Sequence, residues 1–388
     1  MAESQRALAA LAQLQDSCRF GPMTTNRRKQ IHVRTPPPTT KRLTASLNET
    51  PYVLYDYLRN AESRRGTVLY LAYGSNLSNE TFRGSRGIRP LSQINVQVPS
   101  LRMTFDLPGL PYAEPCFANS ARRDPKYDPS SREQCQFEDE KTPLLFDEVR
   151  GQKSYSKDQW HKGLIGVVYE VTPEDYAHII ATEGGGSSYT DILVDCHPFA
   201  SSDPGMPVPQ DPALPPFKAH TLYAPVEDPP KDHGRLQRPN PGYAQASARY
   251  LKLITDGAEE LGLPFEYQDY LHSLRPFTIT TNKQRLGQFV FLMMWAPIVL
   301  AIFGMNKIFA DDNGVVPVWL RELLAAVFKG IWASYDNFFR TMFGDGERTI
   351  GDGADETSNI IGDCLPIQPA DSGDFCGTAD PEKGDPLR

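Results

Sequence analysis

One acidic residue, Glu183, lies where a carboxylate could do acid–base chemistry. It follows a segment with helix-like apolar spacing that ends near Thr182, and it precedes the flexible run Gly184–Gly186. A carboxylate held at such a junction can take a proton from one group and deliver it to another. A glutamate followed by glycine is also a common surface acid at a helix end. Glu183 therefore needs partners before it is more than a candidate.

A short turn offers a second kind of chemistry. Val68 to Tyr73 is an apolar, strand-like run that stops at Gly74-Ser75-Asn76, a turn signal. Backbone N–H groups in such a turn can point into one concavity and bind an anion or a developing oxyanion. The alternative is an ordinary tight turn, which occurs in many folds.

Taken in order, three segments resemble the γ-glutamylcyclotransferase family. The first is similar to its Y-x-A-Y-G-S-N-L signature, the second to its G-V-V-Y … E-G segment, and the third to its S-x-x-Y … G-A … G-L-P-x-x-Y ending. Together they cover roughly residues 67–276, just over half of the chain. The matching residues are Tyr70 to Leu77, Gly166 to Tyr169 with Glu183-Gly184, and Ser247 to Tyr250 with Gly257-Ala258 and Gly262 to Tyr267.

The resemblance implies an α+β fold, a small mixed β-barrel with surrounding helices and an active site at one mouth. It implies a lyase that acts on a small γ-glutamyl compound and releases 5-oxoproline, with Glu183 as the catalytic residue and no cofactor or metal. It also implies substrate binding by Tyr70, Leu71, Ala72, Tyr73, Gly74, Ser75, Asn76 and Tyr250. Without the family pattern, Tyr250 would be interpreted as a core aromatic residue on a helix.

The implied reaction suits one carboxylate. To form 5-oxoproline, the α-amino group of the substrate attacks its own γ-carbonyl. At pH 7 that amine is mostly ammonium, so a base must first remove a proton, and the same group can pass the proton to the departing amine. Such general acid–base help is worth about 10²–10⁴ in rate. Because nucleophile and carbonyl belong to one molecule, orientation in a pocket can contribute further.

Several functional alternatives stay open. The leaving group could be an amino acid, a peptide, or part of a glutathione conjugate in secondary metabolism, as in fungal toxin pathways, and γ-glutamylamines need the same base. A non-catalytic binding protein could keep the fold, although it would be expected to lose the acid. The segment between Glu183 and Tyr189 is one residue shorter than the family pattern, which puts the role of Tyr189 in doubt. The insertion at 120–160 and the proline-rich loop at 198–217 are expected to border the pocket.

Local signals predict the elements that carry these residues. Thr172-Pro173-Glu174-Asp175 predicts a helix start, with an N-cap, a proline in the first turn and two acids. That helix should run to about Thr182. We expect strands at Leu101–Phe105, Leu164–Val171, Tyr189–Cys196 and Ala219–Tyr223, and helices at Gly242–Leu261 and after Asp269.

Composition predicts four regions. Residues 1–66 are expected to be a disordered basic region, and 67–280 the catalytic domain, able to fold by itself. Residues 281–343 should be an apolar membrane-anchoring segment with an amphipathic helix, and 344–388 an acidic disordered tail. The net charge of −8 argues against a nucleic-acid partner. Six scattered cysteines with no C-x-x-C pair predict reduced thiols in an intracellular protein.

The anchoring prediction rests on Phe289 to Met305, seventeen residues without a charge. That length is at the short end for a membrane span, and the alternatives are a buried helix or a helix on the membrane surface. Lys283 and Arg285 flank its N-terminal side, so the positive-inside rule would leave the catalytic domain in the cytosol. Val315 to Phe343 is expected to lie in the membrane interface. The oligomeric state is not predicted.

Overall fold

A computed structural model of the chain describes residues 35–60, 66–123, 157, 159–183, 189–224, 236–309 and 317–351. The chain divides into two compact units, Met1–Ile350 and Gly351–Arg388, and the elements below all belong to the first. The Gly184–Gly186 run, most of the 120–160 insertion, residues 1–34 and residues 352–388 lie outside the described residues.

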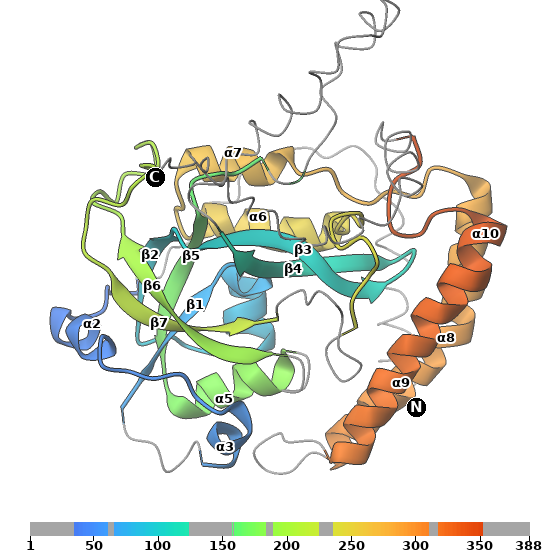
Figure 1. The fold of residues 1–388 in the computed structure, drawn as a ribbon, viewed down its shortest axis with the longest axis horizontal. Coiled ribbons are helices and arrows are strands. Elements are labelled where there is room, and N and C mark those ends of the chain that lie inside the picture. Colours follow the sequence, from blue (N-terminus) through green and yellow to red (C-terminus); the bar gives the residue numbers. More distant parts are fainter. Residues whose placement is uncertain are drawn as a thin grey trace, which may run out of the picture. The chain divides into compact units, whose positions relative to one another are not determined.

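The core of the fold is a closed, five-stranded mixed barrel (Figure 1). Its strands, in barrel order, are β1 (Val68–Ala72), β5 (Leu164–Val171), β2 (Ser92–Val98), β6 (Thr190–Pro198) and β7 (Phe217–Tyr223). β1 pairs with β7 in parallel, and the other described pairings are antiparallel. Every residue of β1 is buried, which explains its unbroken apolar sequence. The α+β class and the small barrel with surrounding helices are confirmed.

Helix α5 (Pro173–Thr182) follows β5 and begins where the sequence predicts. The Thr172 hydroxyl accepts a hydrogen bond from the Asp175 N–H at 3.1 Å, and Pro173 opens the first turn. Tyr176, Ile179 and Ile180 face the core. Local capping sets the start of this helix, its apolar face packs on the core, and Glu183 is its C-cap.

A two-stranded hairpin and two helices complete this part of the fold. The hairpin strands are β3 (Leu101–Leu110) and β4 (Glu114–Arg122), of which β4 was not predicted. Helix α6 (Ala248–Glu260) begins at the Ser247 N-cap, later than the predicted start at Gly242, and α7 (Phe265–Ser273) follows it. A Cβ at Gly257 would lie 2.5 Å from the backbone after β1, so only glycine allows α6 to pack this closely.

The folded region begins well before Thr67, contrary to the predicted disordered region 1–66. Residues 35–60 contain α2 (Thr40–Ser46) and α3 (Leu54–Arg59). The Arg42 guanidinium donates to Thr67 Oγ1 at 2.8 Å and pairs with Glu49 at 2.8 Å. The Tyr52 ring stacks on His220 of β7, 4.3 Å between centroids. The basic composition was misleading because a few side chains, among them Leu54, Tyr57 and Leu58, are buried against distant parts of the chain.

The predicted start of a disordered tail at residue 344 is also wrong, and the segment predicted at 281–343 is helical. Helix α8 (Asn282–Phe309) is followed by α9 (Val318–Ser334), η5 (Tyr335–Phe339) and α10 (Arg340–Phe343). α8 and α9 run side by side (Figure 1), and the Trp295 indole donates to Ser334 Oγ at 3.1 Å between them. Residues 344–350 continue the fold, and Glu347 is 3% exposed. These segments belong to the same compact unit as the barrel.

Candidate active site

Glu183 presents its carboxylate to two donors from the segment after β1. Its own N–H bonds Ile179 O at 2.9 Å, which closes the last turn of α5. Its Oε1 accepts from Asn76 Nδ2 at 2.9 Å and forms an ion pair with Arg86 Nη2 at 2.5 Å. The side chain is about a quarter exposed (25%), so it is held in place and still open to a small molecule.

Asn76 links Glu183 to a buried tyrosine. It lies in the turn η2 (Ser75–Leu77), and its amide Nδ2 is also 2.9 Å from the Tyr70 hydroxyl. Burial raises the pKa of Tyr70 well above its ordinary value, and the negative charge of Glu183 raises it further. Tyr70 is therefore a neutral hydroxyl at physiological pH. Among the described residues, Asn76 Oδ1 is buried without a hydrogen-bond partner.

Arg86 is a site residue that the sequence analysis missed. It is the C-cap of the π-helix η3 (Glu80–Ser85), and its Nη1 also bonds the Thr182 hydroxyl at the end of α5. Its Nε is buried and, within the described part of the chain, has no partner. In the sequence it is one arginine among several after the turn, so only the fold shows that it reaches the carboxylate.

Gly74 and Tyr250 form the second part of the site. The Tyr250 hydroxyl accepts a hydrogen bond from the Ala118 N–H of β4 at 3.1 Å. A Cβ at Gly74 would lie 3.4 Å from that hydroxyl and 3.6 Å from Ala118 Cβ. Burial raises the pKa of Tyr250 above its ordinary value, and the Glu183 charge adds to the increase. Because Glu183 acts on both Tyr70 and Tyr250, the two parts share one electrostatic environment.

The other predicted substrate residues occupy different settings. Leu71 and Ala72 are buried in the barrel strand β1. Tyr73 is half-buried, and its hydroxyl lies 3.2 Å from Ser120 Oγ on β4. Ser75 opens the turn η2, and its carbonyl accepts the Ser78 N–H at 3.1 Å. Tyr189 is partly buried and packs against the hydrophobic core that contains the barrel strands.

The site's chemistry is therefore that of a carboxylate, a guanidinium, an amide and neutral phenols. In the described ranges, no group of three or more His, Cys, Asp and Glu side chains is placed to hold a metal ion. A carboxylate next to neutral hydroxyls and an arginine can exchange protons with a bound substrate and bind an anionic group of it.

Comparisons with known proteins place this chain among enzymes. The family described as "AclK C-terminal domain" matches residues 281–342. The protein "Gamma-glutamyl cyclotransferase gliK" of Aspergillus fumigatus is 31% identical over 283 residues, which is 73% of this chain and 90% of that protein. "Gamma-glutamyl cyclotransferase aclK" of Aspergillus oryzae is 28% identical over 291 residues, 72% of this chain and 90% of that protein.

Similar solved structures include one named "Gamma-glutamyl cyclotransferase", with a TM-score of 0.34 and 17% identity, which covers 56% of this chain and 93% of that chain. The sequence relatives carry the assignment, because nearly the whole length of each aligns with most of this chain. This chain belongs to the gamma-glutamyl cyclotransferase family.

Proposed function

We propose that the protein releases 5-oxoproline from a γ-glutamyl compound, with Glu183 as the proton acceptor. The observation that carries this proposal is the position of Glu183 Oε1, which is fixed by Asn76 and Arg86 at the end of α5. Two neutral phenols, Tyr70 and Tyr250, lie within its electrostatic reach. A base in this setting can meet the substrate's amine without moving far.

The reaction proceeds through one ring closure. Glu183 takes a proton from the substrate's α-ammonium, and the freed nitrogen attacks the γ-carbonyl carbon, which forms the new C–N bond. The carbonyl oxygen carries the negative charge of the tetrahedral intermediate, next to the Gly74–Asn76 turn. The protonated Glu183 then gives its proton to the departing nitrogen as the old C–N bond breaks. The second proton of the ring nitrogen passes through the same carboxylate to the released amine, which leaves as an ammonium. No proton or electron is gained or lost overall.

Arg86 is the residue we assign to the substrate's α-carboxylate. A guanidinium can bind one carboxylate through one pair of N–H groups and a second through others. Its Nη2 already holds Glu183, while its buried Nε has no partner among the described residues. A carboxylate bound there would place the neighbouring α-ammonium next to Glu183. This arrangement orients the nucleophile and leaves the leaving group outside the fixed part of the site.

The leaving group defines the second candidate function. Trimming of glutathione conjugates in secondary metabolism uses the same closure and the same base. It is favoured by the match of residues 281–342 to the AclK C-terminal domain, because this segment lies beyond the part that resembles the γ-glutamylcyclotransferase signature. Under this proposal, the enzyme releases a cysteinylglycine conjugate in place of an amino acid.

The test is 5-oxoproline release, measured by mass spectrometry with γ-glutamyl dipeptides, glutathione and glutathione conjugates. Glu183→Gln should bind substrate nearly normally and lose about 10²-fold or more in turnover, because the amide cannot accept the proton. Glu174→Gln, at the other end of α5, is the matched control and should keep wild-type turnover. Equal turnover in wild type and Glu183→Gln would mean that another residue is the base.

We also propose that the α8–α9 pair associates with a membrane and keeps the catalytic part on the cytosolic side. Among the described helices, one is long and apolar enough to cross a membrane, at Asn282–Ile302. Only 22% of its most apolar stretch of 18 residues is buried in the protein. Phe289 and Met293 are more than half exposed on it, within a run of seventeen uncharged residues. Lys283 and Arg285 lie at its N-terminal end, as expected for a cytosolic flank.

Co-sedimentation with phosphatidylcholine–phosphatidylserine vesicles tests the membrane proposal. Full-length protein should pellet with the vesicles, and the Phe289→Glu, Met293→Glu double variant should stay in the supernatant, because two buried charges are costly in the interface. Met206→Glu alters an exposed methionine elsewhere and should pellet like the wild type. A wild-type chain that remains in the supernatant would refute the proposal.

A further inference from the structure

The turn between β3 and β4 is held by the segment Gly344–Thr349, which we name the C-terminal clamp. Tyr112 occupies that turn with φ at +63°, a left-handed conformation that is uncommon for a tyrosine. It is 1% exposed. Its hydroxyl lies 2.6 Å from Gly344 O, and its N–H donates to Gly346 O at 2.7 Å. The clamp therefore binds Tyr112 through both its side-chain hydroxyl and its backbone N–H.

Gly346 allows the clamp to pack closely against the ring of Tyr112. A Cβ built on it would lie 2.9 Å from three atoms of the Tyr112 ring, closer than real side chains pack. Tyr112 also contacts Phe291 and Tyr335, each edge-on, at 5.8 and 5.7 Å between ring centroids. The hairpin turn is thus enclosed by α8, η5 and the clamp, and a shift of the clamp would displace Tyr112.

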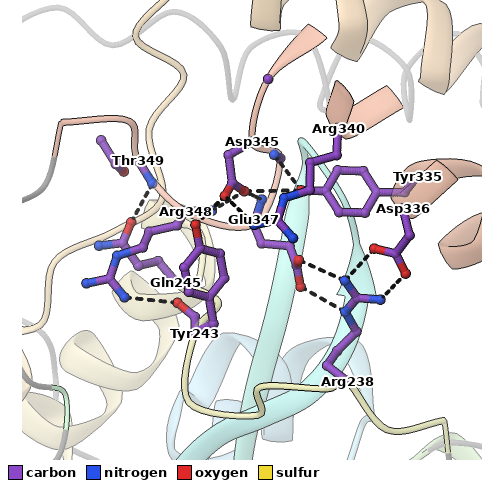
Figure 2. Close-up of polar contacts among 12 residues, drawn as sticks. Arg238, Tyr243, Gln245, Tyr335, Asp336, Arg340, Asp345, Glu347, Arg348 and Thr349 are labelled. Carbon is purple, nitrogen blue, oxygen red and sulfur yellow. Dashed lines mark hydrogen bonds and ion pairs between the residues drawn. The ribbon is translucent and has the colours of Figure 1, made fainter. Parts of the chain in front are cut away.

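Two carboxylates anchor the clamp (Figure 2). Asp345 Oδ1 accepts the N–H groups of Glu347 and Arg348 at 2.7 and 3.0 Å, which folds the clamp into its loop shape. Glu347 accepts from Arg238 Nε and Nη2 at 3.0 and 2.9 Å, and the same guanidinium holds Asp336 at 2.7 Å through two further bonds. Such paired, charge-assisted bonds give a defined geometry.

The clamp also holds the segment that leads into α6. The Gln245 N–H donates to Glu347 O at 2.8 Å, and the Thr349 N–H donates to Gln245 Oε1 at 2.9 Å. Two residues further along, Ser247 caps α6 by accepting the Tyr250 N–H at 3.0 Å. The Ser247 hydroxyl also donates to Glu114, the first residue of β4, at 2.5 Å. One short loop therefore fixes the hairpin turn and the start of α6 together.

These two elements supply both sides of the second part of the candidate active site. β4 provides the Ala118 N–H, and α6 provides the Tyr250 hydroxyl that accepts from it next to Gly74. We propose that the C-terminal clamp positions the Ala118 amide and the Tyr250 hydroxyl for the substrate, through Tyr112 on one side and Gln245 on the other. The role of Tyr250 toward substrate rests on the function proposed above.

The first test compares two buried tyrosines in the full-length chain. Tyr112→Phe removes the hydroxyl that reaches the clamp. Tyr57→Phe is the matched control, because Tyr57 is fully buried and its hydroxyl also reaches a backbone carbonyl, Pro173 O at 3.3 Å. Hydrogen exchange followed by mass spectrometry should show faster exchange in residues 114–122 for Tyr112→Phe and no change there for Tyr57→Phe.

The second test is a double-mutant cycle on kcat/KM. Tyr112→Phe should lower kcat/KM about 5- to 30-fold, and this loss should largely disappear in a Tyr250→Phe background, because the clamp acts through that hydroxyl. Any effect of Tyr57→Phe should be the same in both backgrounds. Gly346→Ala should reproduce Tyr112→Phe, whereas Gly304→Ala, which has open space at its Cβ, should match the wild type.

The outcomes separate the two proposals. Unchanged exchange in residues 114–122 for both Tyr112→Phe and Gly346→Ala would overturn the clamp, whatever the enzyme acts on. Additive losses in the cycle would overturn it as a positioning element of Tyr250. A wild-type chain that releases no 5-oxoproline from any γ-glutamyl compound would instead refute the proposed function, and the exchange result would still decide whether the clamp holds β4.

Discussion

Glu183 Oε1 is shared between an amide and a guanidinium that both come from the segment after β1. The Asn76 amide also donates to the Tyr70 hydroxyl, so this one side chain links the barrel strand β1 to the carboxylate. Because Asn76 and Arg86 both contact Oε1, the other carboxylate oxygen of Glu183, Oε2, is available for a proton. At the scale of single residues, the orientation of the proposed base is therefore set by the fold itself.

Arg86 carries the first prediction at this scale. Arg86→Gln should raise KM for γ-glutamyl substrates about 10- to 100-fold, because a hydrogen bond to a charged group is worth about 1.5–3 kcal/mol. kcat should fall less, since Asn76 still orients Glu183. Steady-state kinetics of 5-oxoproline release measure both constants. Arg89→Gln, an exposed arginine after the same π-helix, is the control and should keep both. An unchanged KM in Arg86→Gln would remove Arg86 from substrate binding.

Among the elements, the segment with α2 and α3 shows how a basic stretch becomes part of a fold. His220 on β7 is fully buried between two carboxylates, Asp191 Oδ2 at 2.8 Å and Glu49 Oε2 at 3.2 Å. Asp191 also accepts the Tyr52 N–H at 2.7 Å. The His220 ring therefore joins the N-terminal segment to the barrel, through a hydrogen bond to Asp191 and close approach to Glu49.

This junction predicts a pH window. Burial alone would raise the pKa of Glu49, but the His220 hydrogen bond and the Arg42 charge lower it, so its contribution is lost as pH falls through that lowered pKa. Burial alone would lower the pKa of His220, but its bonds to Asp191 and Glu49 raise it, so its contribution is lost as pH rises through the raised pKa. Stabilisation by the pair is greatest between these limits.

The measurement is the difference in Tm between wild type and Glu49→Gln across pH. The difference should be largest between the ordinary pKa values of 4.5 for Glu49 and 6.5 for His220, and smaller on either side. Glu174→Gln, which changes an exposed glutamate, should show a flat difference over the same range. A Glu49→Gln difference that stays constant from about pH 5 to pH 9 would mean that His220 does not change its charge in the fold over that range.

On the scale of the whole molecule, the C-terminal helices and the barrel form one unit. Gln284 on α8 donates to Asp345 O at 2.7 Å, and Gln288 donates to Tyr112 O at 2.7 Å. The backbone of Gly287 approaches Phe343 so closely that a Cβ would lie 2.5 Å from its Cβ. The segment expected to be a detachable anchor is thus packed against the catalytic part at its base.

Truncated chains test whether the barrel depends on the C-terminal helices and the clamp. A chain that ends at residue 280 should lose several degrees in Tm and most of its 5-oxoproline release, because Tyr112 and Gln245 lose their partners. A chain that ends at Ile350 keeps the whole clamp, so it should retain wild-type Tm and turnover. Differential scanning fluorimetry and the release assay give the two readings. Full activity in the shorter chain would restore the detachable-anchor interpretation.

The sequence by itself determined the parts of this protein whose signals are local. Thr172 and Pro173 set the start of α5, and the apolar run of β1 with its Gly-Ser-Asn stop set the strand and turn next to it, because capping and turn chemistry act within a few residues. The ordered signature segments also indicated the family, and with it the barrel and the candidate base Glu183.

Only the tertiary structure decided which distant groups meet. Arg86 has no local signature, and the pairing of β4, the stacking of Tyr52 on His220 and the clamp around Tyr112 depend on contacts between segments far apart in the chain. Charged residues such as Arg42 and Glu347 resemble those of solvated tails until a partner of opposite charge is brought beside them by the fold. The physical reason is that burial and ion pairing depend on three-dimensional neighbours, which composition and periodicity do not encode.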